Sequence, residues 1–320
     1  MNYNPIVIVG GEPNSVFLEI FFKAKKIKIK RPVILIASKK LVLSQMKQLK
    51  FNFELNLIKE KKINFDDLEF KKINLIDVPY TFKKPFEKIS NKSNIYISKC
   101  FSIALDILKK NKFADLINGP ISKRNFLKKN FLGITEYLSH KTKMKKNVVM
   151  LIYNKRLSVS PLTTHLPIKD VNKNITKKRI LNQVELITQF YKRKINKKPR
   201  IAVTGLNPHC ESNYESSEED KFIKPAIKSL IKRKYLVKGP YSADTIFMKE
   251  HIKNFDVIIG MYHDQVLTPA KTLFGFKAIN ITLGLPFIRI SPDHGPNIKM
   301  MGKNKSNPIS LIEALKFLDN

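Results

Sequence analysis

Short apolar runs alternate with segments of helical spacing along most of this chain. Runs rich in β-branched residues predict buried strands, because such side chains suit a pleated and packed surface. The predicted strands are Ile6–Val9, Val33–Ala37, Leu75–Val78, Phe113–Ile117, Val148–Tyr153, Leu157–Leu162, Ile201–Thr204, Asp256–Ile259 and Ala278–Leu283. Only a short polar segment separates Val148–Tyr153 from Leu157–Leu162, so we expect these two strands to form a hairpin.

Between these runs, apolar residues recur every three or four positions, which indicates amphipathic helices. The predicted helices are Phe17–Lys26, Leu41–Leu49, Ser98–Lys110, Ile175–Tyr191, Lys221–Arg233 and Ser310–Leu318, with one more beginning at Ser122. Strands that alternate with helices are typical of an α/β fold with a largely parallel sheet. The order of elements therefore predicts the α/β class.

Histidines follow three of the predicted strands, close to the point where each strand ends. They are His165 after Leu157–Leu162, His209 after Ile201–Thr204, and His263 after Asp256–Ile259. Open α/β sheets bind ligands at the carboxyl ends of their strands. A single histidine in such a place is more often a structural residue than a ligand. Three units of the same kind favour a shared site.

Three imidazoles together are a candidate metal site. They suit Zn²⁺, Co²⁺, Ni²⁺ or Fe²⁺ better than Mg²⁺ or Ca²⁺, and they leave coordination positions open for a substrate. Asp264 stands beside His263 and is a candidate orienting or proton-carrying carboxylate. On spacing alone, the alternative that these histidines have structural roles stays open.

Three polar residues after His263 are each bounded by apolar residues, glycine or proline: Lys271, Asn280 and Arg289. Arg289 stands in the segment GLPFIRIS, where an unpaired guanidinium would be expensive to bury. Its fork of N–H donors suits a phosphate or a carboxylate ligand. A structural ion pair with a core carboxylate is the alternative.

Composition narrows the class of protein. The chain has 320 residues, of which 43% are hydrophobic, enough for a sizeable core. No apolar run approaches the ~20 residues that a membrane-spanning helix needs, and the segment MNYNPIVIVGG does not have the pattern of a secretory signal. The two cysteines, Cys100 and Cys210, are too few for a disulfide framework. We therefore expect a cytoplasmic protein.

The formal net charge of +34 raises the question of nucleic-acid binding. The lysines are spread through nearly every segment and accompany many Asn and Ile residues and no Trp, which is typical of A/T-rich coding. We see no known nucleic-acid module. The charge therefore predicts weak, nonspecific binding at low salt and no specific nucleic-acid partner, and it favours an anionic substrate.

A set of motifs carries a resemblance to a known family. In chain order they are THLPIKDV, GLNPH, SADTIF, MYHDQ and NITLGLPFIR followed by DHG. Together they resemble the 4-hydroxythreonine-4-phosphate dehydrogenase family, from Asn118-Gly119-Pro120 to Asn307-Pro308 and more weakly before that. The resemblance implies one family unit over residues 1–320 with a two-lobed α/β/α fold. That fold is similar to isocitrate and isopropylmalate dehydrogenases, with the active site between lobes 1–130 plus 290–320 and 131–289.

The same resemblance implies roles for individual residues. The three histidines would bind one divalent metal, with zinc favoured over cobalt or magnesium. The substrate contacts would be Thr135, Lys271, Asn280 and Arg289. A loop containing His294, Gly295 and Asn307 would hold NAD or NADP, and Asp264 or Asp244 would handle protons. The family forms homodimers that share active-site residues across the interface.

The implied reaction is the NAD(P)-linked oxidation and decarboxylation of 4-phosphooxy-L-threonine to 3-amino-2-oxopropyl phosphate, in pyridoxal 5′-phosphate synthesis. One alternative is a sister dehydrogenase that acts on 4-phospho-threonate or 4-phospho-erythronate. An alternative from another class is a non-catalytic basic binding protein on the same fold. The retained histidines, together with Lys271, Asn280 and Arg289, argue against this last alternative.

The chain departs from the family pattern at three places. The usual G-D-P-A-G-I-G-P-E is GEPNSVFLE at residues 11–19, and a glycine-rich stretch after GLNPH is replaced by CESNYE. The family's G-H-T-E reads Gly133-Ile134-Thr135-Glu136, so a substrate-binding histidine is absent. Tyr214, in the replaced stretch, is a candidate compensating residue. These departures leave the exact substrate less fixed than the reaction class.

Overall fold

The computed structural model describes residues 4–60, 63–111, 114–127, 131, 133–144, 148–211, 216–275, 277–292 and 295–320. The chain divides into two compact units. Unit 1 comprises Met1–Lys143 and Leu285–Asn320, and unit 2 comprises Met144–Gly284. The lobe boundaries inferred from the family resemblance stay a prediction.

Unit 1 is built on a parallel sheet with the strand order β3-β4-β2-β1-β5-β12. Its strands are β1 (Ile6–Val9), β2 (Val33–Ala37), β3 (Leu55–Leu57), β4 (Ile73–Asp77), β5 (Asp115–Asn118) and β12 (Arg289–Ser291). Every residue of β1 is buried, as expected for a central parallel strand that is covered on both faces.

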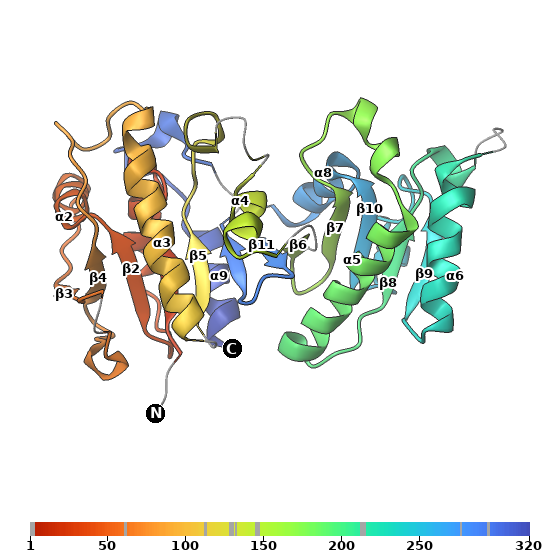
Figure 1. The fold of residues 1–320 in the computed structure, drawn as a ribbon, viewed down its shortest axis with the longest axis horizontal. Helices are drawn as coiled ribbons and strands as arrows, with labels where there is room; N and C mark the ends of the chain where they lie inside the picture. Colours follow the sequence, from red (N-terminus) through yellow and green to blue (C-terminus); the bar gives the residue numbers. More distant parts are fainter. Residues whose placement is uncertain are drawn as a thin grey trace. The chain divides into compact units, whose positions relative to one another are not determined.

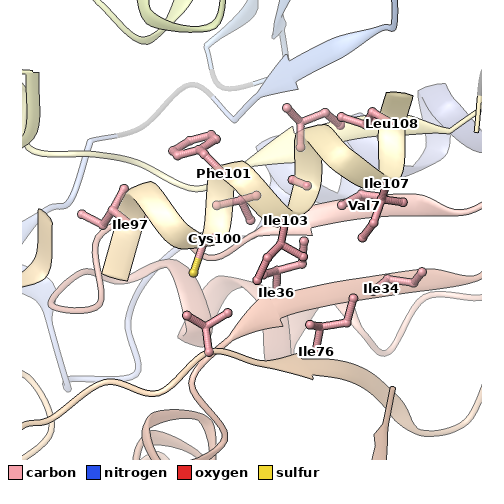
Figure 2. Packing of buried hydrophobic residues seen from close by; sticks show 14 of the residues in the cluster. Val7, Ile34, Ile36, Ile76, Ile97, Cys100, Phe101, Ile103, Ile107 and Leu108 are labelled. Carbon is pink, nitrogen blue, oxygen red and sulfur yellow. The ribbon is translucent and has the colours of Figure 1, made fainter. Parts of the chain in front are cut away.

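The helices of unit 1 are α1 (Phe17–Ala24), α2 (Lys39–Gln48), α3 (Asn94–Lys110), α4 (Ile134–Lys141) and α9 (Ile309–Asp319). Helix α3 lies over one face of the sheet, and Figure 1 shows α9 behind the opposite face. Figure 2 shows side chains of α3, among them Cys100 and Ile107, beside Val7, Ile34 and Ile36 of the strands. The apolar cluster between α3 and the sheet holds the strands of unit 1 in place. The polar residues of this unit follow the ends of these strands.

Unit 2 contains a mixed sheet with the strand order β11-β6-β7-β10-β8-β9. Its strands are β6 (Val149–Tyr153), β7 (Ser158–Thr163), β8 (Ile201–Thr204), β9 (Val237–Tyr241), β10 (Val257–Tyr262) and β11 (Ile279–Leu283). Strand β6 is antiparallel to both β7 and β11, which confirms the predicted hairpin. Strands β7, β10, β8 and β9 are parallel to one another.

The helices of unit 2 are α5 (Lys177–Phe190), α6 (Lys224–Lys232), α7 (Lys249–Ile252) and α8 (His263–Phe274). Figure 1 shows α5 in front of the unit 2 sheet and α8 behind it. Val266 and Ala270 of α8 belong to the same buried cluster as Val159 of β7 and Ile258 of β10. This packing fixes α8, which begins at His263.

The α/β class predicted from the sequence is confirmed, and the strands at Ile6–Val9, Val33–Ala37 and Ile201–Thr204 have the predicted bounds. Helix α8 was not predicted, because Pro269 lies inside it and hides the helical pattern. Phe113, at the start of one predicted strand, lies outside the described residues. Within the described part of the chain, no helix is long and apolar enough to cross a membrane.

Candidate active site

The three histidines follow three neighbouring parallel strands of unit 2. His165 follows β7, His209 lies in a short turn after β8, and His263 is the first residue of α8, directly after β10. Strand β10 pairs with β7 on one side and with β8 on the other. All three imidazoles therefore belong to the carboxyl edge of one sheet, where α/β proteins bind ligands.

His165 and His263 lie close together, with ring centroids 6.1 Å apart. His263 Nδ1 is 2.6 Å from Oδ1 of Asp264. With this carboxylate as acceptor, Nδ1 carries the proton and Nε2 keeps its lone pair, which is the form that ligates a metal. Asp264 thus orients the ring of His263, and its own side chain is 77% exposed.

His209 is held in a different way. Its backbone has φ 55° and ψ 12°, in the left-handed region, which costs a non-glycine residue about 1–3 kcal/mol and persists only where the surroundings enforce it. Its side chain is 74% exposed, and Nδ1 is 4.0 Å from Oδ2 of Asp244. The fold therefore holds this imidazole exposed to water, with the Asp244 carboxylate nearby.

The imidazoles of these loops suit a divalent metal in their chemistry. Among the described residues, no group of three or more His, Cys, Asp or Glu side chains is close enough to hold a metal ion. Within this chain, His165 lies near His263, while His209 lies near Asp244.

Lys271 and Asn280 occupy different places in unit 2. Lys271 is an exposed residue of α8. Asn280 of β11 pairs with Ile152 of β6, which in turn pairs with Val159 near the start of β7. Asn280 therefore lies away from the edge of the sheet that the histidines follow. Its Oδ1 is buried and accepts no hydrogen bond from the described residues. Within the described part of the chain, this buried acceptor is therefore without a partner, which is uncommon for a buried polar atom.

Three elements of unit 1 converge on Arg289, the first residue of β12, which is 1% exposed. Nε donates to Oδ1 of Asn118 at the end of β5 (2.7 Å), and Nη1 donates to Oγ1 of Thr135 in α4 (3.4 Å). Burial lowers the pKa of Arg289 to about 10, and the Glu136 carboxylate acts in the opposite direction. The guanidinium is therefore charged at neutral pH, and the charge of Glu136 favours this state.

Ile134, the residue in place of the family histidine, is the first residue of α4, directly before Thr135. Its side chain packs on the apolar cluster under α3, which also receives Leu285 and Phe287. Ile134 therefore adds apolar contact next to Thr135, which accepts a hydrogen bond from Arg289. Tyr214, the candidate compensating residue, lies outside the described residues.

The predicted cofactor loop is attached to helix α1. Ser306 N donates to Oε1 of Glu19 (2.6 Å), and Lys23 Nζ donates to the carbonyl oxygens of Asn304 (3.0 Å) and Ser306 (2.9 Å). Asn307 accepts a hydrogen bond from Ile309 N (2.9 Å) and so caps α9. Gly295 is exposed, and His294 lies outside the described residues.

Glu12 is a residue that the sequence analysis did not single out as functional. It follows β1 and is 1% exposed; Oε1 accepts from Asn14 N (3.2 Å) and Oε2 from Ser93 Oγ (3.1 Å). Burial raises its pKa to about 7, although both hydrogen bonds favour the ionised form. The only signal in the sequence was a carboxylate between Gly11 and Pro13, at a strand end.

The family model described as pyridoxal phosphate biosynthetic protein PdxA matches residues 28–318. The chain belongs to this PdxA family. A 4-hydroxythreonine-4-phosphate dehydrogenase from Sulfurihydrogenibium sp. is 39% identical over 319 residues, covering 97% of this chain and 96% of the relative. Another, from Aquifex aeolicus, is 32% identical over 325 residues, covering 98% and 97%. The relatives of this PdxA chain are thus named as dehydrogenases, which are oxidoreductases.

Solved structures agree with this membership. The 4-hydroxythreonine-4-phosphate dehydrogenase from Klebsiella pneumoniae has a TM-score of 0.83 at 27% identity, covering 98% of each chain. The protein of the same name from Burkholderia phymatum has a TM-score of 0.80 at 27% identity, covering 100% of this chain and 98% of its own. The PdxA fold therefore extends over both units.

Proposed function

We propose that this chain is a metal- and NAD(P)-dependent dehydrogenase that oxidises and decarboxylates 4-phosphooxy-L-threonine to 3-amino-2-oxopropyl phosphate in pyridoxal 5′-phosphate synthesis. The observation that carries the proposal is the PdxA match over residues 28–318. The relatives' names supply the substrate, a small phosphorylated molecule. We place the enzyme in the cytoplasm.

In this proposal, His165, His209 and His263 hold one divalent ion, and zinc suits imidazole ligands better than magnesium does. When bound, such an ion lowers the pKa of a coordinated hydroxyl and polarises a carbonyl group. Asp264 fixes the proton on Nδ1 of His263, so that Nε2 is the ligating atom. Asp244 and Asp264 are exposed carboxylates beside these imidazoles and are the candidates for proton handling.

A homodimer with its active sites at the interface belongs to the proposal. Among the described residues, the candidate ligands of a single chain do not form a group of three. Asn280 supports the same idea, because its buried Oδ1 accepts no hydrogen bond from the described part of its own chain. A second copy that contributes ligands would complete the metal site. Each chain would have the two lobes expected from the sequence, 1–130 plus 290–320 and 131–289.

The substrate anion would be bound by Arg289, with Thr135 beside it, and by Lys271 and Asn280. Arg289 supports this role because Asn118 and Thr135 hold its guanidinium in a fixed orientation before any ligand arrives. NAD or NADP would accept the hydride, held by the loop that contains His294, Gly295 and Asn307. The attachment of this loop to α1 supports a fixed binding surface.

The sister dehydrogenase is the second candidate, and Ile134 is the observation that favours it. An apolar side chain beside Thr135 suits a substrate that lacks the group that a histidine would meet. The substrate would then be 4-phospho-threonate or 4-phospho-erythronate, oxidised by the same chemistry.

The experiment is an assay of the purified, metal-loaded protein with NAD and with NADP against the three phosphorylated acids. We expect 4-phosphooxy-L-threonine to have the highest kcat/KM and to release CO₂. Removal of the metal with a chelator should stop turnover, and Zn²⁺ or Co²⁺ should restore it. Preference for another acid would assign the sister activity, and no oxidation of any of the three would reject both.

A further inference from the structure

Unit 1 contains a cavity of about 940 Å³ beside helix α3. Three segments line it: α3 itself, the end of α4 with the two residues that follow it, and residues 286–287 before β12. Two other cavities of this unit have about 460 and 300 Å³. Binding sites for small molecules have about 300–1,000 Å³, so the α3 cavity is large enough for one. Neither Arg289 nor Thr135 is among the described residues that line it.

Helix α3 forms one wall of the cavity with a stripe of residues at helical spacing. The stripe consists of Ser98, Ser102, Leu105 and Lys109. These positions are four, three and four residues apart, so they share one face of the helix. Both serines are exposed, and their small side chains keep the cavity open along this wall. A large side chain at Ser102 would therefore fill part of the cavity without entering the core.

Part of the lining is apolar and fixed by the core. Leu105 and Phe287 are half-buried and pack on the apolar cluster between α3 and the sheet. Tyr137 also lines the cavity and is 7% exposed. Its ring packs edge-on against Phe101 and Phe126, with ring centroids 5.7 and 5.3 Å apart. Side chains held in this way suit the apolar body of a ligand, because they need no reordering when it leaves water.

The charged residues of the lining are mostly basic: Lys99, Lys109, Lys141 and Lys143, with Asp106. All four lysines are exposed, and none forms an ion pair with a carboxylate of the described residues. Lys141 Nζ lies over the Tyr137 ring, 5.7 Å from its centroid, which favours a position at the cavity. This excess of positive charge favours a dianionic group such as a phosphate. Lysines are abundant in the chain, so it is their combination with a fixed apolar lining that distinguishes the cavity.

We propose that the α3 cavity is a binding site for a small aromatic phosphate, with its ring against Leu105 and Phe287 and its phosphate at the lysines. The proposal goes beyond the proposed dehydrogenase function and does not depend on it. The family is described as a pyridoxal phosphate biosynthetic protein, and pyridoxal phosphate is itself an aromatic phosphate. The end product of the pathway is therefore one source of such a ligand, and nucleotides are a second.

Calorimetry with the full chain measures the binding of pyridoxine 5′-phosphate, AMP and inorganic phosphate. Pyridoxine 5′-phosphate lacks the aldehyde group of pyridoxal 5′-phosphate, which would react with lysines. Ser102→Phe fills the cavity, and the double variant Lys99→Gln/Lys141→Gln removes two of its charges. The matched control Lys192→Gln/Lys194→Gln removes the same charge from exposed residues of unit 2. Tm reports the stability of each variant, and the lysine variants carry the test if Ser102→Phe fails to fold.

We expect pyridoxine 5′-phosphate to bind at least about tenfold more tightly than inorganic phosphate, because its ring adds apolar burial. Ser102→Phe should remove most of this binding. Lys99→Gln/Lys141→Gln should weaken it at least about fivefold through the loss of two charge contacts, and the control pair should change it less than about twofold. Arg289→Ala should keep it, because Arg289 is not among the described residues that line the cavity.

Three results would overturn the proposal. The first is binding that is lost in Arg289→Ala and kept in Ser102→Phe, which would assign the ligand to the proposed substrate site. The second is equal weakening in both double variants, which would indicate general attraction of anions to a basic chain. The third is a wild type that binds pyridoxine 5′-phosphate no better than inorganic phosphate. Tighter binding of AMP with the same pattern among the variants would support the site and identify a nucleotide as its ligand. Turnover is not measured, so the proposed function is tested separately.

Discussion

Arg289 of unit 1 and His209 of unit 2 differ strongly in their exposure to water. In unit 1, Arg289 is 1% exposed and makes fixed hydrogen bonds to Asn118 and Thr135. In unit 2, the His209 side chain is 74% exposed, and that of Asp244 is 59% exposed. A buried charge must be oriented by its surroundings, because its desolvation is expensive without partners. An exposed imidazole has no such requirement, and its position depends on the backbone that carries it.

This difference shows two ways of preparing a site. Unit 1 orients a charged group through side-chain contacts, so the group itself is fixed before a ligand arrives. In unit 2, side-chain hydrogen bonds hold the backbone near the histidines: Gln265 Oε1 accepts from Met261 N, and Glu219 Oε1 accepts from Leu206 N. Substitutions should therefore act differently: at Arg289 on stability and binding together, and at the exposed histidines of unit 2 on ligand binding with little change in stability.

The largest effect is expected for His263→Ala. The change should remove most bound metal and most activity and leave the fold largely intact, because the side chain is 35% exposed and contributes little packing. Elemental analysis of the purified protein and its Tm provide the measurements. His251→Ala, an exposed histidine of α7, is the control and should keep both metal and activity. Stoichiometric metal retained in His263→Ala would exclude the assignment.

Arg289→Ala should lose about 2–5 kcal/mol of transition-state binding, the range for a buried, charge-assisted contact. The cause is the loss of an oriented guanidinium that is buried from water. The measurement is kcat/KM, with Arg289→Lys as a variant that keeps the charge and lacks the fork of donors. Lys271→Ala tests the exposed residue and should lose less, because water screens its charge. Equal use of non-phosphorylated and phosphorylated substrate would contradict a phosphate role.

Glu12→Gln should change how stability depends on pH. The wild-type carboxyl has an ordinary pKa of 4.5 when unfolded and about 7 when folded, so the wild type loses stability as pH rises between these values. The glutamine of the variant does not titrate in this range. Relative to the variant, the wild type therefore loses about 3 kcal/mol of its free energy of unfolding, and the loss is complete above the folded pKa. Urea unfolding followed by circular dichroism at about pH 4 and pH 8 measures it. Glu54→Gln changes a carboxylate that is 79% exposed and keeps Glu12, so this control should retain the pH dependence of the wild type.

Ile134→His should have the smallest effect. If another residue compensates for the missing imidazole, the new histidine should improve turnover of 4-phosphooxy-L-threonine little, or reduce it by crowding Thr135 and Arg289. We expect this outcome, because the other matched pocket residues are present. Measured kcat/KM decides between the alternatives. A gain of tenfold or more, about 1.4 kcal/mol, would indicate that the natural substrate is that of the sister enzyme.

The strands of both sheets were largely predictable because their apolar, β-branched runs are local signals. The structure also places the three histidines after neighbouring strands, as the repeated pattern indicated; their role as ligands stays a prediction. The short strand β9 was not found because its sequence, VKGPY, has no apolar run. The hydrogen bonds of Gln265 could not be predicted, since its partners Thr204 and Gly205 are distant in sequence and meet it only in the folded sheet.

The chain enters unit 2 at Met144 and comes back to unit 1 at Leu285. This path determines the order in which the two units can complete their folding during synthesis. Strand β12 pairs with β5, and Arg31 Nη1 donates to Leu318 O (2.7 Å), so unit 1 needs residues made after unit 2. Unit 2 can therefore complete its sheet on the ribosome while β5 still presents an open edge, a site for mispairing or chaperone binding. Limited proteolysis of stalled nascent chains should show unit 2 protected first, and simultaneous protection of both units would contradict this order.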